Sequence, residues 1–328
     1  MIMKQTFSSL KRYLRWLILG GTLFFLVHAF ITNWSEVKTI QIHSVQWLVL
    51  AVGFVLTFCA YIWSGWVWYL ILRYFRQPAQ PNWVLPVHLK TNIAKYLPGN
   101  VWHFYGRIWA MKDAGSSLGA ATLSVMLEPL LMAAAASLVT LAGSSLGWVQ
   151  PDHGIYSKLP LLGLGIVLLA VHPRILNPIV SLLNNLQARK QAKLSPHSYP
   201  SQSSEILQHN QSEAENLRLE SYPLIPLLGE LFFVLLRGAG FLCTLATLTE
   251  VSPNYIPVVL SVFSFAWLLG LVVPTPGGLG IFETTTIALL NPYFSTSIVL
   301  SVVALFRVLT ISTEATAAGL GWAMERSK

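Results

Sequence analysis

Long apolar runs separated by short polar or basic segments make up most of this chain. Several runs reach or exceed the ~20 residues that a helix needs to cross a bilayer, so the pattern predicts membrane spans. The apolar runs lie at 16–31, 45–72, 116–148, 159–171, 225–248, 255–273, 281–290 and 295–322. We expect an all-α polytopic membrane protein with about six to eight membrane segments.

Two segments, 95–104 and 272–283, interrupt the apolar pattern with proline and glycine. Proline removes a backbone donor and glycine permits positive φ, so neither segment should form a continuous helix. Inside a bilayer, broken backbone is tolerated only where it is buried in protein or lines a polar cavity. We interpret residues 81–114 as a hairpin that enters from the cytoplasm and returns there. An amphipathic helix lying at the interface is the alternative.

The two interrupted segments share a short pattern at a constant offset of about 178 residues, which suggests an internal repeat. The matching positions are Pro98, Gly99 and Phe104 against Pro276, Gly277 and Phe282. Matching broken segments in two halves of a membrane protein point to a transport site. We therefore predict two inverted repeats, each with a broken or re-entrant Pro-Gly helical hairpin.

The order of segments also predicts how the chain is divided. The polar segment 187–221 cannot bury a core and is expected to be a cytoplasmic linker. It separates an N-terminal membrane half, 1–186, with an extra first span before the first repeat, from a C-terminal half, 222–328. Residues 255–273 either span the membrane or form the first limb of a hairpin that enters from outside. The basic C-terminal tail favours the hairpin, because the last span then ends in the cytoplasm.

Composition and charge agree with the membrane class. The 328 residues are 54% hydrophobic and 10% charged, against about 25% charged residues in soluble domains. The net charge of +8 fits basic cytoplasmic loops that face anionic lipid headgroups better than it fits nucleic-acid binding. The basic residues before the first apolar run place the N-terminus in the cytoplasm.

Few motifs for catalysis or cofactor binding are present. The histidines have no metal-ligand spacing, the two cysteines form no disulfide framework, and no nucleotide fingerprint or nucleophile–base pair stands out. We therefore expect no metal, no cofactor and no enzymatic activity.

Charged residues within apolar sequence form the main candidate site, since each costs ~2.5–3.5 kcal/mol in a membrane unless paired or hydrated. Glu230 and Arg237 lie two helical turns apart on one face, and Arg307 and Glu314 repeat this spacing. One interpretation is a polar cavity in which Arg237 and Arg307, with Arg107, attract an anionic headgroup while carboxylates balance them or carry protons. The alternative is a set of interhelical salt bridges that only stabilise the bundle.

The Pro-Gly segments add further candidates. Helix N-termini after Gly99 and Gly278 would present free N–H groups to an anion. His103 could titrate near neutral pH, although a lone histidine beside a tryptophan is more often structural. The candidate lipid-binding or transport residues are Lys95, Tyr96, Pro98, Gly99, Asn100, His103, Arg107, Glu128, Glu230, Arg237, Pro276, Gly277, Gly278, Gly280, Glu283, Arg307 and Glu314.

The motifs Lys95-Tyr96-Leu97-Pro98-Gly99-Asn100-Val101-Trp102, Gly106-Arg107 and Pro276-Gly277-Gly278-Leu279-Gly280-Ile281-Phe282-Glu283 carry a resemblance. Over nearly its whole length the chain resembles the flippase-like membrane domain found at the N-terminus of lysylphosphatidylglycerol synthases and in stand-alone proteins. The resemblance implies a multi-pass bacterial inner-membrane protein that moves, or is proposed to move, a lipid between leaflets. No soluble aminoacyl-transfer domain follows the last span, so synthase activity is not expected. The linker 187–221 is longer than the family pattern needs.

These observations predict a flippase or transporter for an anionic phospholipid or a polyprenyl-phosphate-linked lipid. The alternative is a non-transporting membrane scaffold or partner subunit for a separate lipid-modifying enzyme. The expected partners are membrane lipids with anionic headgroups, together with a second copy of the chain or a lipid-synthesising enzyme, and no nucleic acid.

Overall fold

The computed structural model describes residues 44–77, 79–97, 101–146, 159–172, 174, 177–178, 222–273 and 280–326, and this part of the chain is helical. The predicted first span at 16–31, the linker at 187–221 and the central residues of both Pro-Gly segments lie outside these ranges.

Within these described ranges, five helices are long and apolar enough to cross a membrane. They are α2 (Ser44–Tyr74), α5 (Leu118–Ser145), α9 (Leu224–Leu248), α10 (Ile256–Val272) together with the short helix η3 (Pro253–Tyr255) before it, and α12 (Thr296–Arg326). The prediction of an all-α polytopic membrane protein is therefore confirmed. A shorter apolar helix, α6 (Leu159–Val171), packs against α5.

The segment predicted as the first hairpin is a pair of short helices. Helix α3 (Pro81–Asn92) begins with proline at a position where no backbone donor is needed, and it continues into η1 (Ile93–Tyr96). Helix α4 (Trp102–Asp113) follows the Pro-Gly segment and contacts α3. The proline and glycine thus separate two helices, as expected from the loss of a backbone donor.

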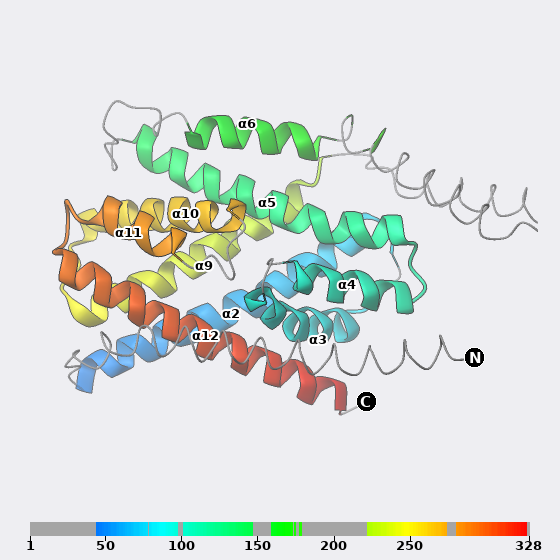
Figure 1. Cartoon of the computed structure of the whole chain (residues 1–328), viewed down its shortest axis with the longest axis horizontal. Coiled ribbons are helices and arrows are strands. Elements are labelled where there is room, and N and C mark those ends of the chain that lie inside the picture. The colour runs from blue at the N-terminus through cyan, green and yellow to red at the C-terminus, as the bar shows by residue number, and fades with distance from the viewer. Residues whose placement is uncertain are drawn as a thin grey trace, which may run out of the picture.

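The second Pro-Gly segment joins α10 to α11 (Ile281–Leu290), and these two helices also contact each other. Figure 1 shows α3 and α4 at the right of the molecule and α10 and α11 at the left, with the joined ends of both pairs toward the middle. Helix α11 returns to the end where α10 begins, and α12 then runs to the opposite end. This arrangement favours the hairpin alternative for 255–290. Re-entry into a bilayer and the inverted-repeat relation stay predictions.

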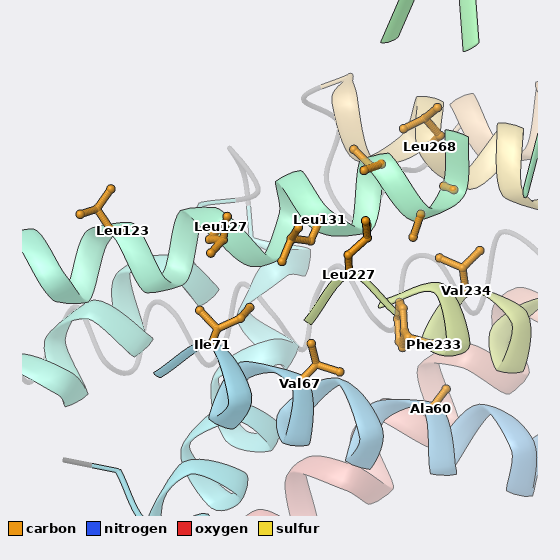
Figure 2. Packing of buried hydrophobic residues seen from close by; sticks show 14 of the residues in the cluster. Ala60, Val67, Ile71, Leu123, Leu127, Leu131, Leu227, Phe233, Val234 and Leu268 are labelled. Atoms are coloured by element: carbon orange, nitrogen blue, oxygen red, sulfur yellow. The ribbon is translucent and has the colours of Figure 1, made fainter. Parts of the chain in front are cut away.

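The hydrophobic core lies between α2, α5 and α9, and α10 completes it. Figure 2 shows Val67 and Ile71 of α2 facing Leu127 and Leu131 of α5, with side chains of α9 beside them. The small residues Ala133–Ala136 on α5 are all buried. Small side chains let membrane helices approach closely, which is the main source of helix association in lipid.

One close contact of this kind joins α5 to α10 at Gly143. A Cβ atom added to Gly143 would lie 2.6 Å from Cβ of Ser261 and closer still to its Oγ. The same addition at Gly319 on α12 would meet nothing within 4 Å.

We expect Gly143→Ala to lower the thermal unfolding midpoint in detergent, because overpacking costs about 1–3 kcal/mol. Gly319→Ala is the matched control, since it has the same gain in helix propensity, about 1 kcal/mol, without the clash. Equal midpoints for the two variants would contradict this packing.

Candidate functional site

The joined ends of the two hairpins border one cavity of about 330 Å³. Helices α2, α5, α9 and α12 supply its remaining walls. Its charged and ionisable lining includes Lys95, His103, Arg107, Glu128, Arg237 and Arg307. Residues from both predicted repeats therefore meet at one place, as the interpretation of a polar cavity requires.

Glu128 on α5 anchors the first hairpin. Its carboxylate forms an ion pair with the Arg107 guanidinium of α4. His88 Nε2 of α3 lies 3.0 Å from Glu128 Oε1, and Ser64 Oγ of α2 donates a hydrogen bond of 3.1 Å to the same atom. All four side chains are buried. Glu128 therefore holds α2, α3 and α4 to α5.

Glu314 on α12 forms a second cluster. Lys95 Nζ of η1 lies 2.6 Å from Glu314 Oε1, and the Tyr61 hydroxyl of α2 donates to the same oxygen. Arg237 of α9 donates from Nη1 to the Tyr61 hydroxyl at 2.7 Å. The Arg237 guanidinium also lies 5.1 Å from the centre of the Tyr61 ring and 5.4 Å from that of Phe306, distances at which cation–π attraction is effective.

Glu283 forms a third cluster, at the start of α11. Its Oε2 accepts a hydrogen bond of 2.7 Å from the backbone N–H of Gly280, whose φ of +87° favours glycine. Its Oε1 accepts from Arg307 Nε of α12 at 2.8 Å. Glu283 thus caps α11 and ties the second hairpin to α12.

Charged residues that share a helix face do not pair with each other. Glu230 and Arg237 share a face of α9 but form no ion pair with each other, and Arg307 and Glu314 do not pair on α12. Residues seven apart lie about 10.5 Å apart along a helix, too far for direct contact. Each observed pair instead joins different elements.

Two charged groups are left over. Arg237 is 6% exposed and makes no ion pair with a carboxylate in the described part of the chain. Glu230 is 0% exposed, and neither of its carboxylate oxygens has a hydrogen-bond partner within the described ranges.

The predicted residues fall into three groups. Lys95, Tyr96, His103, Arg107, Glu128, Arg237 and Arg307 line the cavity. Glu283, Glu314 and Gly280 adjoin it through the contacts above, and Glu230 is buried and does not line it. Pro98, Gly99, Asn100, Pro276, Gly277 and Gly278 lie outside the described residues.

His103 fits the structural interpretation better than a titrating one. Burial, reinforced by the nearby Arg107, lowers the pKa of His103 well below its usual 6.5. The ring packs against Phe104, with 3.7 Å between ring centres. A neutral imidazole is expected at pH 7.

Sequence reasoning missed Tyr61, Ser64 and His88. Tyr61 and Ser64 are three apart and share a face of α2, where they are polar groups in an apolar helix. That spacing is the signal that could have found them. His88 stands in the polar limb of the first hairpin, but its partner Glu128 is distant in sequence.

One comparison with known proteins identifies the family of the chain. The family model described as "Lysylphosphatidylglycerol synthase TM region" matches residues 17–316. None of the curated proteins matches the chain.

The pairing of Arg107 with Glu128 can be tested by stability. Arg107→Met leaves the Glu128 charge buried without its cation, so we expect a loss of about 3–5 kcal/mol in unfolding free energy. The double variant Arg107→Met/Glu128→Leu removes both charges and should recover most of that loss. Thermal unfolding in detergent measures both variants, with the exposed Arg73→Met as control. A double variant as unstable as the single one would show that the pair is not coupled.

Proposed function

Because the chain belongs to the lysylphosphatidylglycerol synthase TM region family, we propose that it moves an anionic lipid between membrane leaflets. The family indicates a membrane-lipid-related role. Movement of the lipid between leaflets is our proposal. The cargo is an anionic phospholipid or a polyprenyl-phosphate-linked lipid. No covalent step is part of the proposal.

The observation that carries this proposal is Arg237. A buried cation without a carboxylate partner attracts an anion strongly, because little water is present to screen it. Arg237 lines the cavity, and its Nε has no hydrogen-bond partner in the part of the chain that the structure describes. Arginine binds phosphate oxygens through several N–H donors at once. A phosphodiester headgroup therefore suits this position.

The size of the cavity supports headgroup rather than whole-lipid binding. A volume of about 330 Å³ is at the lower end for ligand pockets. Val101 and Val272, one from each hairpin, line the cavity and are exposed to the surroundings. An apolar opening of this kind lets acyl chains stay in hydrocarbon while the headgroup lies inside.

Helix α12 is the element best placed to coordinate the two hairpins. Its Glu314 holds Lys95 of the first hairpin, and its Arg307 holds Glu283 of the second. In the proposed cycle an entering phosphate competes with these carboxylates for their cations. Exchange of partners would loosen one hairpin while the other stays fixed, which is the local change that alternating access needs.

We also propose a location in the bacterial inner membrane, with the N-terminus in the cytoplasm. The helix ends at the right of Figure 1 carry Arg73, Lys112 and Arg326. The described helix ends at the left carry neither lysine nor arginine, and Glu250 follows the end of α9. Basic residues are enriched on the cytoplasmic side of membrane proteins, so the right end is assigned to the cytoplasm.

The test is leaflet exchange of fluorescent phosphatidylglycerol in proteoliposomes. Arg237→Gln removes a charged donor worth about 1.5–3 kcal/mol, so we expect exchange to fall by roughly 10- to 100-fold. Arg237→Lys should retain part of the activity, and Arg73→Gln, an exposed change outside the cavity, should retain all of it.

Two results would contradict the proposal. One is full exchange by a stably inserted Arg237→Gln variant. The other is absence of exchange by folded wild-type protein with both phosphatidylglycerol and a polyprenyl phosphate, which would favour the scaffold alternative.

A further inference from the structure

Glu230 is a buried acid that none of the three ion-pair clusters uses. It lies on α9 with 0% exposure, and both carboxylate oxygens lack a hydrogen-bond partner in the described residues. The adjacent Gly229 carbonyl accepts a hydrogen bond of 2.8 Å from Trp63 Nε1, which fixes this turn of α9 against α2. An ionised carboxylate without a partner is costly in such a place, while the protonated acid is tolerated far better.

The groups around Glu230 explain why a partner is lacking. The ionised groups that interact with it electrostatically are Glu128 of α5 and Arg107 of α4. Arg107 already pairs with Glu128, and the oxygens of Glu128 are further held by His88 and Ser64. One guanidinium therefore faces two carboxylates and neutralises only one of them.

The other elements packed against α9 do not change this balance. Helix α2 presents the neutral phenol of Tyr61, and α10 has no ionisable side chain. On α12, Arg307 and Glu314 pair with Glu283 and Lys95. Among the described residues, Glu230 is thus a buried carboxylate without a cation of its own.

We propose that Glu230 is the proton-binding residue of the site, and that a proton bound there accompanies the anionic headgroup at Arg237. This inference rests on the proposed function. With Glu230 neutral, four cations, Lys95, Arg107, Arg237 and Arg307, face three carboxylates, Glu128, Glu283 and Glu314. A headgroup with one negative charge then makes the site neutral.

With Glu230 ionised, the site is neutral before the headgroup enters and negative afterwards. In a low-dielectric interior that excess charge opposes binding. Proton binding and anion binding therefore favour each other, and the coupling is reciprocal. The proton comes from water in the cavity, forms the O–H bond of the neutral acid, and returns to water when the headgroup leaves. Ser64 and Glu128 line the cavity, and Glu128 interacts electrostatically with Glu230.

Glu230→Gln mimics the protonated acid, and Glu230→Met serves as a second variant if the glutamine variant does not fold. Glu325→Gln is the matched control, because Glu325 is a 61% exposed carboxylate at the end of α12, outside the cavity. Exchange of phosphatidylglycerol is followed in proteoliposomes at a series of pH values, equal on both sides.

We expect wild-type and Glu325→Gln exchange to rise as the pH falls, by up to about tenfold per pH unit, the limit for one proton. Exchange by the Glu230 variant should persist and become independent of pH. Wild-type exchange that does not vary with pH, or a Glu230 variant with the wild-type profile, would overturn the inference.

A second readout separates this inference from the proposed function. Infrared difference spectra of detergent-solubilised protein, wild type against Glu230→Gln, should contain the carbonyl band of a protonated carboxylic acid. Its absence would overturn the assignment of the proton to Glu230. If wild-type protein exchanges no lipid but shows this band, the proposed transport fails while the proton site stands.

Discussion

The requirement that a buried charge be compensated organises the centre of this protein. Apolar and small side chains pack α2, α5, α9 and α10 together. The ion pairs add a specific charged partner for each hairpin. Glu128 binds the first hairpin to α5, and Glu283 binds the second to α12. In a low-dielectric interior, breaking one such pair is costly, so each hairpin has few alternative positions.

The same requirement links structure to function. Three carboxylates are satisfied by three cations, which leaves Arg237 and Glu230 on one face of α9. A bundle stabilised only by salt bridges has no need for a fourth cation at its cavity, because an unpaired buried charge lowers stability. A site that binds and releases an anion, as we propose, does need one. In that proposal the bound anion compensates the cost of burying Arg237.

The sequence predicted the helices well and their contacts less well. Apolar runs identify spans because a helix satisfies its backbone hydrogen bonds in hydrocarbon, and proline with glycine locates the breaks between η1 and α4 and between α10 and α11. Charged residues near apolar sequence, such as Arg107 and Glu283, stand out because unpaired charges are costly in hydrocarbon. The ion-pair partners of these residues could not be predicted, because the sequence does not show which helix packs against a given helix face. The ion pair between Lys95 and Glu314 joins positions 219 apart in the sequence. Tyr61, from a third segment, bridges Glu314 and Arg237 by hydrogen bonds.

The position of a bound lipid phosphate would show whether Arg237 is the anion-binding group. Solid-state nuclear magnetic resonance in bilayers measures dipolar coupling between lipid phosphorus and isotope-labelled arginine nitrogen, with Arg237→Lys to assign the signal. We expect coupling between phosphatidylglycerol phosphorus and the Arg237 guanidinium, at about 4 Å or less, as direct hydrogen bonding requires. Coupling only to other arginines, or none with lipid present in excess, would contradict it.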